Sequence, residues 1–343
     1  MGHRLLPIVA AFLFWGLVAP VAGSSGTQHA PVYLALGDSL AFGVGASNPL
    51  GTGYVARVYQ SLEGSERYRQ GGLDLINLSV PGAKSSDLQA AGGELDSALK
   101  VIGERQQHAL PAANDVEIIT IDIGGNDLLA LVAPGSPCLQ SASVEPCRAA
   151  FGDVLSSIQN NLMETIRRLR QAAPEAIIVV VDLYNPFSGT GDLREPIAEL
   201  GVGQANGVIG AVLASTELQA RAASVFQLFS GRGGQWIAPD GIHPNDYGHA
   251  VIAEAVLAAI AGREPAIPNS LLSMSPGATS APLQPNTVTD SNNDSGGVSV
   301  SVFLAGIAVA FAAGLVVCST IPLPLVVQDH YLRFVGNGGP RNR

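Results

Sequence analysis

The sequence predicts an α/β fold in which a five-stranded parallel sheet lies between two layers of helices, a three-layer α/β/α sandwich. Apolar residues run continuously through five short segments, which is typical of strands that are buried on both faces of a sheet. Segments with the spacing of amphipathic helices separate these strands, and this alternation favours parallel strands joined by crossover helices. The pattern extends over residues 30–262, which we predict to form one domain.

The five strands are expected where β-branched and aliphatic residues cluster between turn-forming residues. The first strand ends at Gly37, Asp38 and Ser39, and the second and third strands also end at runs of small residues. The fourth is a run of Ile and Val, and the fifth is a short segment that contains two Phe residues. We predict strands over residues 32–36, 73–78, 116–123, 176–183 and 224–229.

Five helices are expected between and after these strands, because apolar residues recur there at the spacing of one helix face. The third helix shows this pattern most clearly, since its face carries Leu155, Ile158, Leu162, Ile166 and Leu169. The last helix follows a loop that ends at Pro244 and Asn245. We predict helices over residues 53–62, 95–110, 151–172, 196–222 and 246–261.

Residues 1–23 have the layout of a secretory signal peptide. A weakly basic start is followed by an apolar run over 5–18 and then by small residues, a pattern that predicts export and cleavage near Ala22 or Gly23. An uncleaved membrane anchor is the alternative, but the apolar run is short for a bilayer, which needs about 20 residues.

The residues after the domain change in composition. Residues 263–297 combine several prolines with Ser, Thr and Asn, which predicts a flexible stalk. Residues 298–318 carry no charge and are long enough for a transmembrane helix. The segment 328–343 contains Arg333 and two further arginines, so the positive-inside rule predicts a short cytoplasmic tail and an extracellular domain in the cell membrane.

Two other interpretations of the apolar segment are less favoured. A buried core helix would need covering layers that the residues after it cannot supply. A glycolipid-anchor signal would place the apolar residues at the very end of the chain, whereas a polar segment follows them here.

The charge and cysteine content exclude some classes of function. The net charge is -10 and only 13% of residues are charged, so the chain lacks the basic surface of a nucleic-acid-binding protein. Cys138 and Cys147 lie in one loop of the exported part, where an oxidising environment favours a disulfide. Two cysteines without a nearby histidine do not make a zinc site, and we expect no metal. Cys318, at the inner end of the span, is either free or acylated.

Residues suited to acyl transfer follow the predicted strands. Ser39 follows the first strand, Gly82 the second and Asn126 the third, and Asp240 and His243 precede the last helix. In a parallel sheet these positions meet at one edge. A serine nucleophile needs a base such as His243 and a group such as Asp240 that orients the base, and oxyanion donors complete such a site.

Each of these residues also has a plain structural interpretation. Ser39 or Asp38 could simply cap a helix, Gly82 could be a turn residue, and Asn126 could form an Asx turn. His249 follows Asp246 by three positions, the same spacing as the Asp240–His243 pair. We interpret Asp246 as a first-turn residue of the last helix and His249 as a residue within that helix. A metal site built from the two pairs would need an unusually tight loop.

The four motifs together resemble those of the SGNH (GDSL) hydrolase family. They are Gly37-Asp38-Ser39-Leu40, the segment 77–83 that contains Gly82, Gly124-Gly125-Asn126-Asp127, and Asp240-Gly241-Ile242-His243-Pro244, and they occur in the family's order over residues 31–262. The resemblance implies a flavodoxin-like α/β/α fold, Ser39 as nucleophile, His243 as general base and acid, and Asp240 as its partner. It also implies an oxyanion hole formed by the backbone N–H groups of Ser39 and Gly82 and the side-chain amide of Asn126.

Other hydrolase and nucleotide-binding patterns are missing. No Gly-x-Ser-x-Gly motif surrounds Ser39, which disfavours the α/β-hydrolase fold. No phosphate-binding loop follows a strand, which disfavours a nucleotide enzyme. Asp122, inside the third strand, is expected to be a buried carboxylate with its hydrogen bonds satisfied.

We therefore expect an extracellular, membrane-tethered serine esterase or lipase-like acylhydrolase that needs no cofactor. Its substrate would be a small-molecule, lipid or acylated-glycan ester, and its membrane contact would be the C-terminal helix. One alternative is a carbohydrate O-acetylesterase acting on cell-envelope polysaccharide, and the other is a ligand-binding module of the same fold without catalytic activity.

Overall fold

A parallel sheet of five strands forms the centre of the computed structural model, which describes residues 30–107, 115–133, 135–140 and 145–269. The strand order is β2-β1-β3-β4-β5, and every neighbouring pair is parallel. The strands are β1 (Val32–Gly37), β2 (Asp74–Asn77), β3 (Val116–Asp122), β4 (Ile177–Val181) and β5 (Ala220–Ala223). The prediction of an α/β fold with five parallel strands is therefore confirmed.

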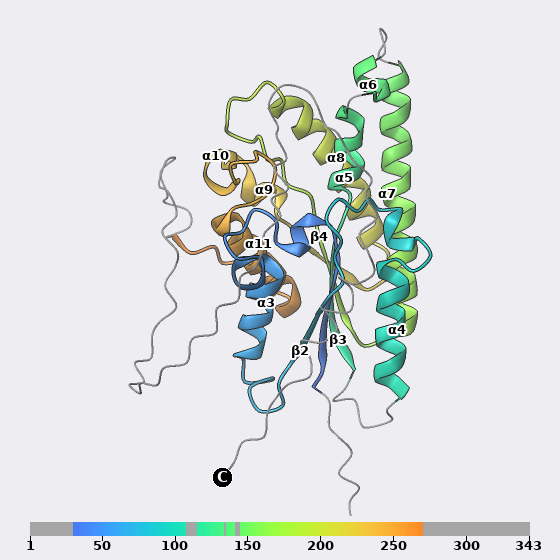
Figure 1. Ribbon diagram of the computed structural model, residues 1–343, viewed down its shortest axis with the longest axis vertical. Helices are drawn as coiled ribbons and strands as arrows, with labels where there is room; N and C mark the ends of the chain where they lie inside the picture. Colours follow the sequence, from blue (N-terminus) through green and yellow to red (C-terminus); the bar gives the residue numbers. More distant parts are fainter. Residues whose placement is uncertain (1–29, 108–114, 134, 141–144, 270–343) are drawn as a thin grey trace, which may run out of the picture.

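Three long helices cover one face of the sheet: α4 (Glu94–Gln107), α7 (Glu145–Ala172) and α8 (Glu195–Leu213) (Figure 1). The core between them and the strands is aliphatic, with Leu34 of β1 and Ile158 of α7 among its fully buried members. Branched aliphatic side chains pack well on the pleated surface of a sheet, so this layer holds the strands in register.

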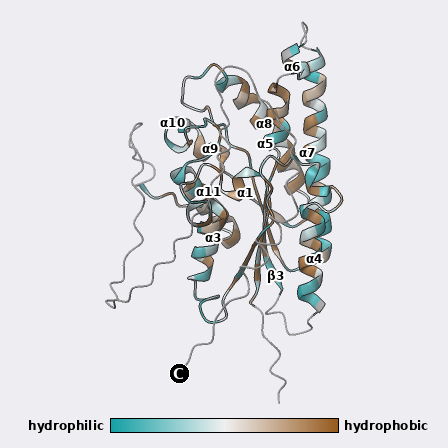
Figure 2. Ribbon diagram, viewed as in Figure 1, coloured by the Kyte–Doolittle hydropathy of each residue, from teal (hydrophilic) through white to brown (hydrophobic). Residues whose placement is uncertain are grey.

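Two helices, α3 (Tyr54–Glu63) and α11 (Asp246–Ala261), cover the other face. The short helices α9 (Phe226–Phe229) and α10 (Gly233–Trp236) complete this layer. Phe229 packs edge-on against Trp236, with ring centroids 5.2 Å apart, and stacks on Tyr184 at 4.7 Å. Figure 2 shows the apolar residues concentrated in the strands, whereas polar residues recur along α4 and α7.

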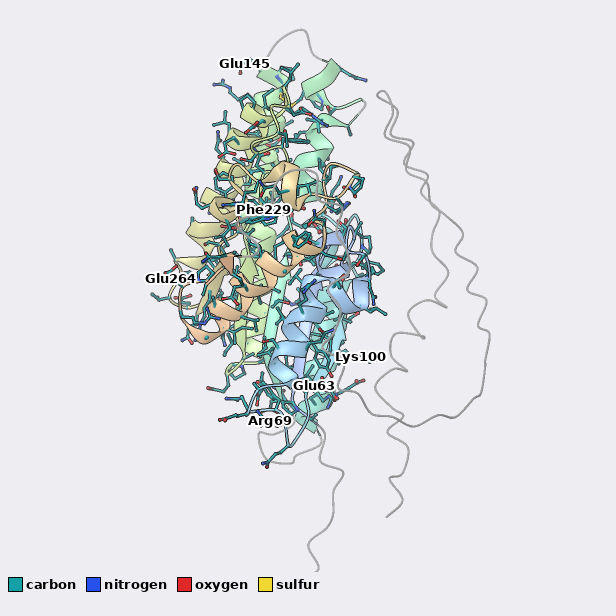
Figure 3. The ribbon with its side chains drawn as sticks, turned by 90° about the vertical axis from the view of Figure 1, so that its left-hand side faces the viewer. Glu63, Arg69, Lys100, Glu145, Phe229 and Glu264 are labelled. Carbon is teal, nitrogen blue, oxygen red and sulfur yellow. A yellow bond between two sulfur atoms is a disulfide. The ribbon has the colours of Figure 1, made fainter. Side chains whose placement is uncertain are left out.

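Helix α7 is longer than its apolar face predicts. It begins at Glu145, six residues before the expected start, and its 28 residues span about 42 Å at 1.5 Å per residue. The short helix α6 (Pro137–Gln140) lies beside its first turns, and a disulfide joins Cys138 of α6 to Cys147 of α7. Figure 3 places Glu145 near one end of the molecule and Arg69 near the other.

The fifth strand is not where the sequence predicts it. Residues 226–229 form helix α9, whereas β5 lies at Ala220–Ala223, inside the expected helix 196–222. That helix ends at Leu213. The prediction failed because β5 is mostly alanine and carries Arg221, whose guanidinium donates to the carbonyl oxygens of Ala259 and Ile260 at the end of α11. In a segment with weak strand propensity, a tertiary contact thus determines which secondary structure forms.

The remaining described elements are short. The structure adds α1 (Ser39–Phe42), α2 (Pro49–Thr52), α5 (Gly125–Leu129) and the 3₁₀ helices η1 (Asp87–Gln89) and η3 (Ala130–Val132), which the sequence did not predict. The last helix has the predicted bounds. The expected signal peptide, most of the stalk, the transmembrane helix, the tail and Cys318 lie outside the described residues. Within the described ranges, no helix combines the length and apolarity that a membrane span requires.

Candidate active site

Ser39 lies at the carboxyl end of β1 and is the first residue of α1. The side chain of Asp38 caps this helix, because its Oδ1 accepts the N–H of Leu40 at 2.9 Å. Gly37 has a φ of 144°, and a Cβ added there would lie only 2.4 Å from the backbone oxygen of Asp122. Only glycine therefore lets β1 and β3 approach closely where the serine leaves the sheet.

His243 connects Ser39 to Asp240. Its Nε2 lies 2.9 Å from Ser39 Oγ, and its Nδ1 lies 2.7 Å from Asp240 Oδ2. A carboxylate can only accept, so we assign the ring proton to Nδ1, which leaves Nε2 to accept the serine hydroxyl. The structure thus brings the three predicted catalytic residues into one hydrogen-bonded chain.

The loop between α10 and α11 holds Asp240 and His243 in this arrangement. Asp240 Oδ1 accepts the N–H groups of Ile242 and His243 at 2.9 and 3.0 Å. Partial burial acts to raise the pKa of Asp240, but these hydrogen bonds and the His243 ring outweigh it and leave the pKa below its ordinary value. Asp240 is therefore ionised at neutral pH and can stabilise a protonated imidazole.

Residues outside the family motifs fix the path of this loop. The hydroxyl of Tyr184 donates to the carbonyl oxygen of Ile242 at 2.8 Å. The backbone N–H of Ala238 donates to the carbonyl oxygen of His243, also at 2.8 Å. Asn245 caps α11 by accepting the N–H groups of Tyr247 and Gly248. Neither Tyr184 nor Asn245 was predicted from the sequence to support the site, although an Asn directly before a predicted helix is a recognisable N-cap signal.

The predicted oxyanion donors come from three loops. In the part of the chain that the structure describes, the backbone N–H groups of Ser39 and Gly82 have no hydrogen-bond acceptor. Asn126 Nδ2 donates to the carbonyl of Ala83 at 2.9 Å and to Asp38 Oδ2 at 3.2 Å. Both amide hydrogens thus already have acceptors, and Asn126 can donate to an oxyanion only by sharing one of them.

The second aspartate–histidine pair, Asp246 and His249, is not part of the hydrogen-bonded series that links Ser39, His243 and Asp240. His249 is fully buried in α11, where its Nδ1 accepts the N–H of Tyr54 at 3.2 Å and its Nε2 donates to the carbonyl of Val44 at 3.0 Å. Burial lowers the pKa of His249 to about 4. Asp246 accepts hydrogen bonds from Ser47 and Thr52. The pair has a structural role, which agrees with our interpretation of the sequence.

The structure also shows how candidate metal ligands are distributed and which residue is the partner of Asp122. Among them, no three His, Cys, Asp or Glu side chains are grouped so that they could hold a metal ion. The hydroxyl of Tyr54 donates to Oδ1 of the buried Asp122. Nothing in the sequence pointed to this pair, because 68 positions separate the two residues.

Two pockets lie beside the motif loops. One, of about 280 Å³, borders the loop that carries Gly82 and is lined by Val80, Pro81, Gly82, Ala83, Asp87, Gly93 and Glu94. The other, of about 370 Å³, borders the loop that carries Asp240 and is lined by Pro186, Phe187, Thr190, Gly191, Asp192, Arg194, Gly233, Gly234, Ile237, Ala238 and Gly241. Each pocket therefore borders a loop that carries a candidate site residue, although neither is lined by Ser39 or His243 themselves.

Comparison with known proteins identifies the family. Residues 35–251 match the model of the GDSL-like lipase/acylhydrolase family. The chain is 25% identical over 235 residues to the spore germination lipase LipC of Bacillus licheniformis, covering 67% of this chain and 97% of that protein. A crystal structure of a lipase from a goat rumen metagenome has the same fold, with a TM-score of 0.50 and 22% identity over 67% of this chain and 97% of that one. An acetyl xylan esterase from Geobacillus stearothermophilus gives a TM-score of 0.45 and 19% identity over 70% and 100% of the two chains. The chain therefore belongs to the GDSL-like lipase/acylhydrolase family and is a hydrolase of ester bonds.

Proposed function

We propose that the protein is a serine esterase or lipase-like acylhydrolase that cleaves carboxylic esters through an acyl-enzyme on Ser39. The observation that carries this proposal is the chain of contacts from Ser39 Oγ through His243 to Asp240, at 2.9 and 2.7 Å. Hydrogen-bond reach between a nucleophile and its base, with a third group orienting the base, is the geometric signature of an activated serine.

The reaction can be derived from the protons that Ser39 and His243 carry in this hydrogen-bonded series. Ser39 Oγ attacks the ester carbonyl carbon while His243 Nε2 takes the hydroxyl proton, and Asp240 stabilises the imidazolium that forms. The tetrahedral intermediate collapses, and His243 returns the proton to the departing alcohol. A water molecule then repeats the cycle on the acyl-enzyme, which releases the carboxylic acid and restores the serine.

Three donors are proposed to hold the negative oxygen of the intermediate. The N–H groups of Ser39 and Gly82 have no other acceptor among the described residues and are free to donate. Gly82 has a φ of 86°, a conformation that glycine adopts without strain. Asn126 is the third donor through the amide that also contacts Ala83.

Labelling with a fluorophosphonate probe tests the nucleophile. We expect the full-length protein and the control Ser61→Ala, at an exposed position of α3, to be labelled equally. Ser39→Ala should not be labelled, and its kcat on p-nitrophenyl butyrate should fall by about 10⁶-fold, as when a serine nucleophile is removed elsewhere. Equal labelling of Ser39→Ala, or no labelling of the wild type, would contradict the proposal.

The substrate class has two candidates. A lipid ester is favoured by the name of the curated lipase relative and by three exposed apolar residues, Leu193 just before α8 and Ile197 and Leu200 in its first turns. A glycan O-acetyl ester is favoured by the pocket beside the Asp240 loop, because its lining includes the hydrogen-bonding side chains of Thr190, Asp192 and Arg194. A series of acyl chain lengths separates them, because activity confined to acetyl esters indicates the glycan and activity on long chains indicates the lipid.

The domain organisation and location are likewise proposed from the sequence. We propose a signal peptide at 1–23, a catalytic domain at 30–262, a stalk at 263–297, a transmembrane helix at 298–318 and a cytoplasmic tail at 328–343. The family match at 35–251 lies inside the proposed catalytic domain, which supports these limits. In this arrangement the enzyme acts outside the cell, within reach of its own membrane.

A further inference from the structure

Three buried carboxyl groups lie behind the loop that carries Ser39. Asp38, Glu94 and Asp122 are 6%, 5% and 2% exposed. In the described part of the chain, none of the three forms an ion pair with Lys or Arg. Buried carboxyl groups without a cation tend to retain their protons, because burial disfavours the charged form.

Two of these groups hold the backbone on both sides of Ser39. Glu94, at the start of α4, accepts the N–H of Gly37 through Oε2 at 2.7 Å. Asp122, at the end of β3, accepts the N–H groups of Asp38 and Ala41 through Oδ2, both at 3.3 Å. The nucleophile loop is therefore anchored by side chains that belong to two other elements.

Glu94 also reaches the loop of the proposed oxyanion hole. It lines the 280 Å³ pocket together with Val80, Pro81, Gly82 and Ala83. A negative charge at this point would lie near the oxygen that becomes negative during the reaction and would oppose it. A neutral carboxyl would hold Gly37 without this cost.

We propose that Glu94 is a positioning residue that holds the Ser39 loop as a neutral carboxylic acid and impairs acylation when it ionises. This inference rests on the proposed function, since it assumes that Ser39 is the nucleophile. Glu94 would act through Gly37 and the N–H of Ser39, without contacting the reacting atoms.

The surroundings of Glu94 agree with a neutral form. Burial raises the pKa of Glu94 to about 8. The N–H of Gly37 acts to lower this pKa, whereas a negative charge on the nearby Asp38 or Asp87 raises it further. Helix α4 also packs on α7, which carries Arg168. This arginine pairs with Asp96 of α4, at 3.6 Å, and not with Glu94. The titratable groups that act on Glu94, Asp38 at the N-cap of α1 and Asp87 of η1, are thus both acidic.

The test compares three variants of the full-length protein on p-nitrophenyl butyrate between pH 6 and 9.5. Glu94→Ala removes the acceptor for Gly37, Glu94→Gln keeps an acceptor oxygen that cannot ionise, and Glu104→Gln changes an exposed residue of the same helix. We expect Glu94→Ala to lower kcat by about 10- to 100-fold, as small misplacements of reacting groups do, with little change in KM. Glu94→Gln should keep most of the kcat at pH 7 and should lose the decline that the wild type and Glu104→Gln show above pH 8.

Several results would overturn the proposal. An unchanged kcat in Glu94→Ala would exclude a positioning role, and an alkaline decline that persists in Glu94→Gln would exclude the neutral form. The rate of fluorophosphonate labelling of the wild type needs no variant, and a rate that does not decline between pH 7 and 9.5 would also contradict it. If the wild type is not labelled at all, the proposed function fails, which is a separate result.

Discussion

Asn126 is the residue that joins the three motif loops. Its amide contacts Ala83 in the second loop and Asp38 in the first, while its own backbone lies in the first turn of α5, after the third strand. An amide with both hydrogens already bonded is fixed in orientation before the substrate arrives. Preorganised donors of this kind contribute most to stabilising a developing oxyanion.

We expect Asn126→Ala to lower kcat by about 10²-fold, the lower end of the range for losing one oxyanion donor. The effect should be at this end because the hydrogen is shared with Ala83 or Asp38. KM should change little, since the donor acts mainly in the transition state. Steady-state kinetics with Asn160→Ala, an exposed asparagine of α7, as the control would check this. An unchanged kcat would remove Asn126 from the proposed oxyanion hole.

The residues that the sequence could identify differ in kind from those that it could not. Ser39 and His243 lie in local motifs, so their chemistry can be read from the residues around them. Glu94 acts on Gly37 across 57 positions, and Tyr54 reaches Asp122 across 68. Their importance comes from the register of β1 against β3 and from the position of α4, which only the folded chain reveals.

At the scale of the elements, a helix or strand was predicted correctly where one apolar helix face, or a strong helix or strand propensity, dominates the segment. Helix α11 has the predicted bounds because Asn245 caps its start and Gly262 ends it in the left-handed conformation. Strand β5 was missed because its alanines favour no particular structure, and the bonds from Arg221 to the end of α11 hold the segment against the sheet. The first turns of α7 were missed because they contact α6 instead of the apolar core.

The disulfide between α6 and α7 should affect stability more than activity. Its cysteines are nine positions apart, and the loop-entropy model assigns about 2–3 kcal/mol to a closed loop of this size. We expect the double variant Cys138→Ser/Cys147→Ser to lose up to about this free energy of unfolding. Its kcat should stay unchanged, because α6 stands at the outer end of α7, away from the strands (Figure 1).

Urea unfolding followed by circular dichroism, together with ester hydrolysis, measures both quantities. The wild type treated with a reductant is the matched control, since it breaks the same bond without a substitution. Equal stability of the oxidised and reduced proteins would show that the bond is not needed, and a large loss of kcat would show that this end of α7 supports the active site.

At the scale of the whole molecule, buried titratable groups set the pH range in which the domain is stable. The pKa of Glu94 is raised by burial to about 8, so between its unfolded value near 4.5 and 8 the folded state binds a proton that the unfolded state lacks. The free energy of unfolding therefore falls as the pH rises through this range. His249 has the opposite effect, because burial lowers its pKa from 6.5 to about 4 and stability falls as the pH drops below 6.5.

We expect the melting temperature to be highest near pH 6 and to decline towards pH 9. Asp182 acts at lower pH, because burial raises its pKa from 3.8 to about 6 and the stability that its proton confers is lost between these values. Calorimetry of the wild type and of Glu94→Gln over pH 4–9 would measure this, and the variant should lose less stability above pH 7. A melting temperature of the wild type that rises between pH 7 and 9 would contradict the prediction.

The contact between Ser39 and His243 spans 204 positions of the chain. A nascent or incompletely folded chain contains the serine that follows β1 long before the loop that precedes α11 brings the histidine to it. Contacts between residues so far apart in sequence form slowly, because closing the long segment between them costs entropy. The proposed catalytic pair is therefore complete only after the residues up to His243 have been synthesised and have folded against the loop that carries Ser39.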